Sequence, residues 1–121
     1  MAIIADIGVA LVALLHGYFL ILEMFLWDKP AGLRAFGQKK EDAEKTKVLA
    51  ANQGLYNGFI AAGLVWGLIQ GSAGFDFKVF FLACVIAAGI FGAITASRKI
   101  LYVQALPGLL SLALVLLTHS L

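Results

Sequence analysis

The sequence predicts an all-α integral membrane protein, a four-helix bundle built from a single domain of 121 residues. Apolar residues make up 62% of the chain and charged residues 13%, whereas soluble domains average about 45–50% and about 25%. Four apolar stretches are each close to the roughly 20 helical residues that cross a bilayer. The stretch 79–95 carries no charge on any face, which excludes a soluble bundle, because soluble helices need polar outer faces.

The four predicted spans follow one another along the whole chain. They cover residues 3–27, 48–70, 77–96 and 102–118. Only the first loop, residues 28–47, has room for structure of its own. From about Lys40 we expect a helix that runs directly into the second span, because Glu41 and Lys45 have the i,i+4 spacing of a helical ion pair. Pro107 lacks the N–H of a helical hydrogen bond, which predicts a kink or a loosened backbone in the fourth span.

The basic residues predict a single orientation in the membrane. Of nine basic residues, six lie in the first loop, two in the third loop and one, Lys78, beside the second loop. Cytoplasmic loops of membrane proteins carry an excess of Lys and Arg. We therefore expect cytoplasmic loops one and three, both termini outside, and several passes through the inner (plasma) membrane. The first segment lacks the basic region of a secretory signal, so it is expected to be a retained helix.

Polar side chains inside the spans are the candidate functional residues, because a charge at mid-membrane costs about 2.5–3.5 kcal/mol on insertion scales. His16 and Glu23 are seven residues apart in the first span. They therefore share one helix face, about 10 Å apart along the axis. We predict that they are the catalytic, proton-transferring residues. Trp27 lies about one turn further along the same face.

The second span places more polar residues at the cytoplasmic depth of Glu23. These residues cover an arc of about 140° on a helix that turns 100° per residue, and Gly54 and Gly58 form a small-residue seam on the opposite arc. A bundle that buries such residues together contains a polar pocket inside an apolar shell. The predicted ligand-binding residues are Asn52, Gln53, Tyr56 and Asn57 of the second span, with Trp27 and Tyr102.

Each of these residues also has a purely structural interpretation. Glu23 could pair with Arg98 or accept a hydrogen bond from Asn57. The amides could hold helices together, and tyrosines are common at membrane interfaces. His16 could be a buried, hydrogen-bonded histidine.

Other chemistries find little support. Cys84 is the only cysteine, which excludes an internal disulfide framework. The chain has no HExxH motif, no nucleotide-binding loop and no nucleophile motif. We therefore expect no metal and no cofactor, a haem shared between subunits through His16 being the alternative. A net charge of +2 argues against a nucleic-acid partner, and the glycine seams favour a homo-oligomer within the lipid bilayer.

Two strings in the first and second spans resemble a known family. The strings are HGYFLILEMFLW and KVLAANQGLYNGFIAAGLVWGL, and the family is the uncharacterised group of small bacterial integral membrane proteins known as domain-of-unknown-function family 1304. The resemblance covers nearly the whole chain and implies four spans, but it implies no activity. It rests on His16, Glu23, Trp27, Asn52, Gln53, Gly54, Tyr56, Asn57 and Gly58.

Three functions fit these observations. The first is an intramembrane polar pocket for a small lipophilic molecule, with isomerase-like acid–base chemistry carried out by Glu23 and His16. The second is a proton-coupled small-molecule transporter, because small multidrug exporters share this length, four spans and a first-helix glutamate. The third is a structural or partner membrane subunit. Whether the protein is an enzyme stays open at this point.

Overall fold

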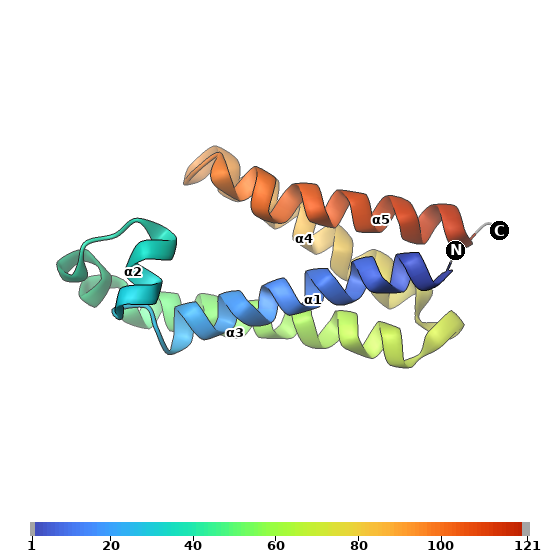
Figure 1. Cartoon of the computed structure of the whole chain (residues 1–121), viewed down its shortest axis with the longest axis horizontal. Helices are drawn as coiled ribbons and strands as arrows, with labels where there is room; N and C mark the ends of the chain where they lie inside the picture. Colours follow the sequence, from blue (N-terminus) through green and yellow to red (C-terminus); the bar gives the residue numbers. More distant parts are fainter. Residues whose placement is uncertain (1, 120–121) are drawn as a thin grey trace. The chain divides into compact units, whose positions relative to one another are not determined.

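The structure is a computed structural model that describes residues 2–119, and in that range it consists of helices joined by short turns, with no strand. Two short turns interrupt the longer helices, a 3-10 turn before α4 and a π-helical turn before α5 (Figure 1). In chain order the elements are α1 (Ala2–Met24), α2 (Pro30–Phe36), α3 (Lys40–Ile69), η1 (Gly71–Gly74), α4 (Phe75–Thr95), η2 (Leu101–Ala105) and α5 (Leu106–His119).

Three helical segments are long and apolar enough to cross a membrane, and they mark the chain as a membrane protein. They are Ala2–Met24, Gly71–Thr95 and Leu101–His119, and they coincide with the first, third and fourth predicted spans. The region of the second predicted span is helical as part of α3. Among the described helices, this region is not apolar enough to count as a membrane-crossing segment, because the amide side chains in its first half lower its mean hydropathy. The crossing of α3 and the four-helix membrane bundle stay predictions.

The described residues form two compact units. Residues 14–61, called here the central unit, hold the second half of α1, all of α2 and the first part of α3. Residues 2–13 and 62–119, called here the terminal unit, hold the remainder.

In the terminal unit, α4 packs against η2 and α5 through small residues. Gly89 of α4 lies against Ala105 of η2, and both are buried. Gly108 of α5 lies against Val85 of α4, whose side chain is fully buried. The N–H of Leu106 bonds to the carbonyl of Leu101, five residues earlier. This π-helical turn ends two residues before Pro107, and it is the loosened backbone that the missing proline N–H predicts.

In the central unit, α1 ends earlier than the apolar stretch does. The N–H groups of Phe25 and Leu26 both bond to the carbonyl of Ile21, and the chain leaves the helix after Met24. Trp27 therefore lies in the connecting turn and not in the span. Helix α3 then begins at Lys40, as predicted, and continues for 30 residues.

Candidate functional site

A buried carboxylate and a buried amide meet in the central unit. The Nδ2 atom of Asn57, on α3, donates to the Oε1 atom of Glu23, near the end of α1. Each residue is only 8% exposed. The hydrogen bond thus joins the two predicted site residues of this unit that are the most buried after His16.

Glycines of α3 allow this close approach. A Cβ atom at Gly54 would lie 3.1 Å from the Cβ of Glu23 and 2.6 Å from the Cγ of Met24. One turn later, a Cβ at Gly58 would lie 2.6 Å from the Cδ1 atom of Leu20. Small residues let helix backbones approach each other in this way. Any larger residue at Gly54 would push α3 away from Glu23 and lengthen the hydrogen bond.

The structure divides the predicted polar arc of α3 into two parts. Asn57 lies on the same side of α3 as Gly54 and Gly58, facing α1. The sequence predicts instead that these glycines lie opposite all four polar residues. A step of 100° per residue leaves Asn57 only about 60° from Gly54, so the amide belongs to the edge of the glycine seam.

The other polar residues of that arc are exposed. Asn52 donates to the carbonyl of Val48 on its own helix at 2.9 Å. Tyr56 is 60% exposed, and Gln53 is exposed as well. Tyr102 belongs to η2 in the terminal unit and is 64% exposed. Of the five predicted ligand-binding residues that lie in the central unit, only Asn57 therefore forms a hydrogen bond with Glu23.

His16 shares the buried face of α1 with Glu23. Its side chain has no solvent exposure, and its ring meets Phe19 edge-on with 5.4 Å between the ring centres. The seven-residue separation places it about 10 Å from Glu23 along the helix axis. A proton therefore needs a bridging water or ligand to pass between the two.

Glu23 forms no ion pair among residues 2–119. The ion pairs in that range are Lys47–Asp28 and Lys78–Asp6. Arg98, the alternative partner, is exposed and belongs to the terminal unit. A carboxylate offers about four lone-pair sites, and the neutral amide of Asn57 takes one of them. Glu23 thus keeps the capacity to bind a proton or a further hydrogen-bond donor.

Trp27 is held by the loop that follows α1. Its Nε1 atom donates to the Oγ1 atom of Thr46 at 3.1 Å, and its ring lies 4.8 Å from the ring of Phe36. The one donor of the indole is therefore already used. Neither partner was predicted from the sequence, although Thr46 and Phe36 both lie in the loop that joins the first two predicted spans.

The same loop carries an ion pair that makes its stability sensitive to acid. The hydrogen bond from Lys47, 3.2 Å away, holds the pKa of Asp28 below its ordinary value. A lowered folded-state pKa stabilises the fold above the ordinary pKa, and this contribution is lost as the pH falls through the lowered value. We expect the fluorescence of Trp27, followed in a Trp66→Phe background, to report loosening of the loop below about pH 4.

Two lysine variants test this expectation. Lys47→Met removes the partner of Asp28, so the folded pKa of Asp28 should return toward its ordinary value and the acid-dependent step should become smaller. Lys45→Met, an exposed neighbour with no such ion pair among the described residues, should leave the step in place. An identical acid profile for Lys47→Met and the unmodified protein would argue against the role of this pair.

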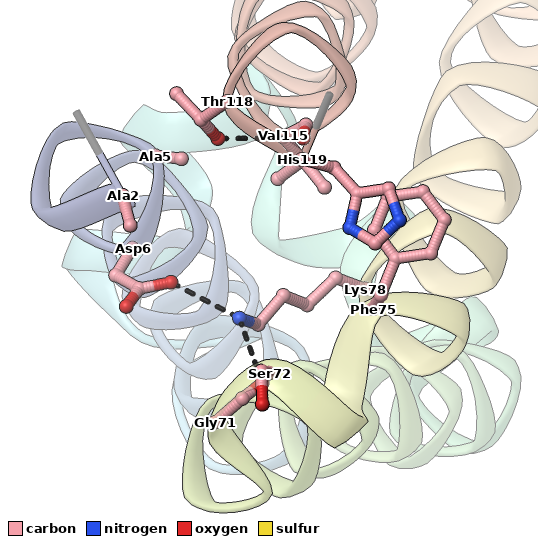
Figure 2. A pocket seen from close by; sticks show the side chains of 10 residues that line it. All are labelled: Ala2, Ala5, Asp6, Gly71, Ser72, Phe75, Lys78, Val115, Thr118 and His119. Carbon is pink, nitrogen blue, oxygen red and sulfur yellow. Dashed lines mark hydrogen bonds and ion pairs between the residues drawn. The ribbon is translucent and has the colours of Figure 1, made fainter. Parts of the chain in front are cut away.

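A second polar cluster, which sequence reasoning did not identify, lies in the terminal unit. Lys78 of α4 forms an ion pair with Asp6 of α1, with 3.1 Å between Nζ and Oδ1, at the edge of a cavity (Figure 2). The positions of these two charged residues in the sequence are the feature that could have identified the cluster. Lys78 is the only basic residue outside loops one and three, and Asp6 is the first acidic residue of the chain.

Among residues 2–119, no group of three or more His, Cys, Asp or Glu side chains is arranged to hold a metal ion. Acid–base and hydrogen-bonding chemistry is what these residues offer directly.

Comparison with known proteins places the chain in a family. A family model described as a protein of unknown function, DUF1304, matches residues 10–116. An uncharacterized protein of Lactococcus lactis, YpaA, is 35% identical over 117 residues, which cover 95% of this chain and 97% of that protein. No solved structure gives a significant match. The chain therefore belongs to the DUF1304 family of proteins of unknown function.

Proposed function

We propose that the protein is a multi-pass protein of the inner membrane whose Glu23–Asn57 site binds a small lipophilic molecule that carries a polar group. The observation that carries this proposal is the buried Glu23 carboxylate, which has a neutral amide as its hydrogen-bond partner and no ion pair among the described residues. Intramembrane carboxylates are expensive to bury and commonly mark sites of ligand or proton binding.

The chemistry that suits this site is proton transfer without a cofactor. Glu23 takes a proton from one carbon of the bound molecule, and a proton returns at another carbon, so that a double bond moves and no atom is gained or lost. The Asn57 amide fixes the carboxylate, and its dipole stabilises developing charge. His16, buried on the same face, is the second proton carrier in this proposal, with the water or ligand of the site as the bridge.

The exposed part of α3 favours a second candidate, a structural or partner subunit. Gln53 and Tyr56 are exposed on a helix that is expected to lie in lipid, where polar groups without a hydrogen-bond partner are unfavourable. Asn52 beside them is exposed too and bonds only to its own helix. A second copy of the chain or another membrane protein would satisfy them. In this case the Glu23–Asn57 hydrogen bond only locks α1 to α3. A proton-coupled transporter would use the same carboxylate as its proton carrier.

Accessibility of Glu23 to a lipophilic reagent separates these possibilities. A lipophilic carbodiimide partitions into the membrane and modifies carboxyl groups there, and peptide mass spectrometry locates the adduct. We expect the reagent to modify Glu23 in the full-length protein in lipid nanodiscs. A water-soluble carbodiimide should instead modify Glu44, which is exposed in the loop portion of α3.

Two variants complete the experiment. Glu23→Gln keeps a hydrogen-bond acceptor for Asn57 and should abolish the lipophilic adduct. The matched control, Glu44→Gln, should leave that adduct unchanged. Absence of the Glu23 adduct in the unmodified protein indicates a closed helix lock and supports the subunit function. An adduct that is suppressed by a pH gradient across proteoliposomes, together with proton flux lost in Glu23→Gln, supports transport.

A further inference from the structure

The cavity of the terminal unit lies where three membrane-competent helices end. Its volume is about 310 Å³, and Ala2, Gly71 and His119 contribute to its lining (Figure 2). These three residues are also terminal residues of the three segments able to cross a membrane. When those segments cross a bilayer, the cavity therefore lies at the level of the lipid headgroups, which flank the hydrocarbon core.

A buried cation forms one side of the cavity. Lys78 is 8% exposed, and its Nζ atom contacts the Oδ1 atom of Asp6 at 3.1 Å and the carbonyl oxygen of Gly71 at 3.5 Å. An ammonium group has three N–H donors. Two acceptors within the described residues leave one donor for a ligand, and an anionic oxygen is its best acceptor.

A carboxylate that is open to solvent forms the other side. The side chain of Asp6 is 48% exposed, against 10% for Lys78. The Oδ1 atom contacts Lys78, which leaves the Oδ2 atom for a donor from a ligand. Opposite charges thus face the cavity a few ångströms apart, and a purely anionic or purely cationic ligand would be repelled by one of them.

An aromatic pair lines the cavity beside the ion pair. The ring of His119 stacks on the ring of Phe75 with 3.6 Å between their centres. Figure 2 shows this stacked pair on one side of the cavity and Ala2, Ala5 and Asp6 on the other. The imidazole can add a second donor near an anion, since each neutral histidine carries one N–H.

We propose that this cavity binds the zwitterionic headgroup of a phospholipid with a primary ammonium group, of the phosphoethanolamine type. The phosphate contacts Lys78, and the ammonium group donates to Asp6. A volume of about 310 Å³ lies at the low end of small-molecule sites, about 300–1,000 Å³, which fits a headgroup better than a whole lipid. The site is separate from the function proposed for Glu23, and the predicted orientation places it in the outer leaflet.

Native mass spectrometry of the full-length protein in detergent tests the proposal. The protein is titrated with phosphatidylethanolamine, phosphatidylcholine and phosphatidylglycerol of identical acyl chains. We expect the ethanolamine lipid to bind about tenfold or more tightly than the other two. The choline group has no N–H for Asp6, and the glycerol lipid offers Asp6 no cation. Free phosphoethanolamine, added as a competitor, separates a lipid site from a site for a soluble metabolite of the same chemistry.

Variants of the charged pair locate the binding. Asp6→Asn should remove the preference for ethanolamine over choline, and Lys78→Met should weaken binding of both lipids. Asp76→Asn, an exposed carboxylate in the first turn of α4, is the matched control and should leave the preference intact. Because Lys78→Met can disturb folding, Ala2→Phe provides a second test, filling the cavity from an exposed position. Equal binding of all three lipids, or an unchanged preference in Asp6→Asn and Ala2→Phe, overturns the proposal.

Discussion

Replacing Gly89 by alanine is expected to destabilise the terminal unit by about 1–3 kcal/mol, the usual effect of overpacking a tight core. A Cβ atom at Gly89 would lie 2.6 Å from the backbone nitrogen of Ala105 and 2.9 Å from its Cα atom. Backbone atoms of a π-helical turn cannot rotate away as a flexible side chain can. The new methyl group would therefore push α4 away from η2, and Gly89→Leu would push further.

The reactivity of Cys84 offers a direct measurement. Cys84 lies on α4 and is half-buried, so a thiol-reactive dye should modify it faster as α4 separates from its neighbours. The midpoint of labelling against temperature should fall in Gly89→Ala.

A matched control lies one turn away on the same helix. At Gly92 the added Cβ would meet the side-chain atoms of Ile100 at 3.1 and 3.2 Å, and a side chain can shift by a few tenths of an ångström. Gly92→Ala should therefore change the labelling midpoint much less. Equal shifts at the two glycines would show that helix propensity, and not contact with η2, dominates.

Local chemistry made much of the fold predictable. The helix that begins at Lys40 was expected from a charged i,i+4 pair, and the structure confirms its start. The disturbed backbone before Pro107 follows from a missing N–H, and the structure shows it as the η2 turn. Both features depend on neighbours within about one helical turn, which a sequence displays directly.

The contacts at the two polar sites could not be predicted from the sequence, because they depend on how the helices are placed in space. Asp6 and Lys78 are 72 residues apart, and their pairing requires α1 and α4 to be placed in space. On α3, Asn52 and Asn57 have the same side chain. Only Asn57 lies beside the glycine seam that faces α1, whereas Asn52 bonds to its own helix. The predicted helical arc grouped all the polar residues on one side and the glycines on the other, so it could not distinguish Asn52 from Asn57.

Trp27 shows how an early helix end changes a predicted site. A helix that continued to residue 27 would place the indole on the face of His16 and Glu23. The helix ends at Met24, and the indole instead bonds to Thr46. Hydropathy did not predict this end, because residues 25–27 are apolar and the turn is set by their backbone hydrogen bonds.

Replacing Asn57 by leucine is expected to destabilise the central unit by about 1–3 kcal/mol, the cost of leaving a buried polar group without its partner. Leucine has a similar size but donates no hydrogen bond, so Glu23 would stay buried with its Oε1 atom unsatisfied. Unfolding by a denaturing detergent, followed through Trp27 fluorescence in the Trp66→Phe background, measures the difference. Asn52→Leu is the control on the same helix, because the Asn52 side chain is exposed and bonds only locally.

The double variant Glu23→Leu/Asn57→Leu separates stability from function. Replacing both partners of a buried hydrogen bond by apolar groups of similar shape is nearly neutral, so the double variant should be more stable than Asn57→Leu alone. Additive destabilisation by the two changes would instead show that the pair is not coupled. If a stable double variant also lacks the binding proposed for Glu23, the carboxylate is present for its chemistry, since an apolar pair would hold α1 and α3 together equally well.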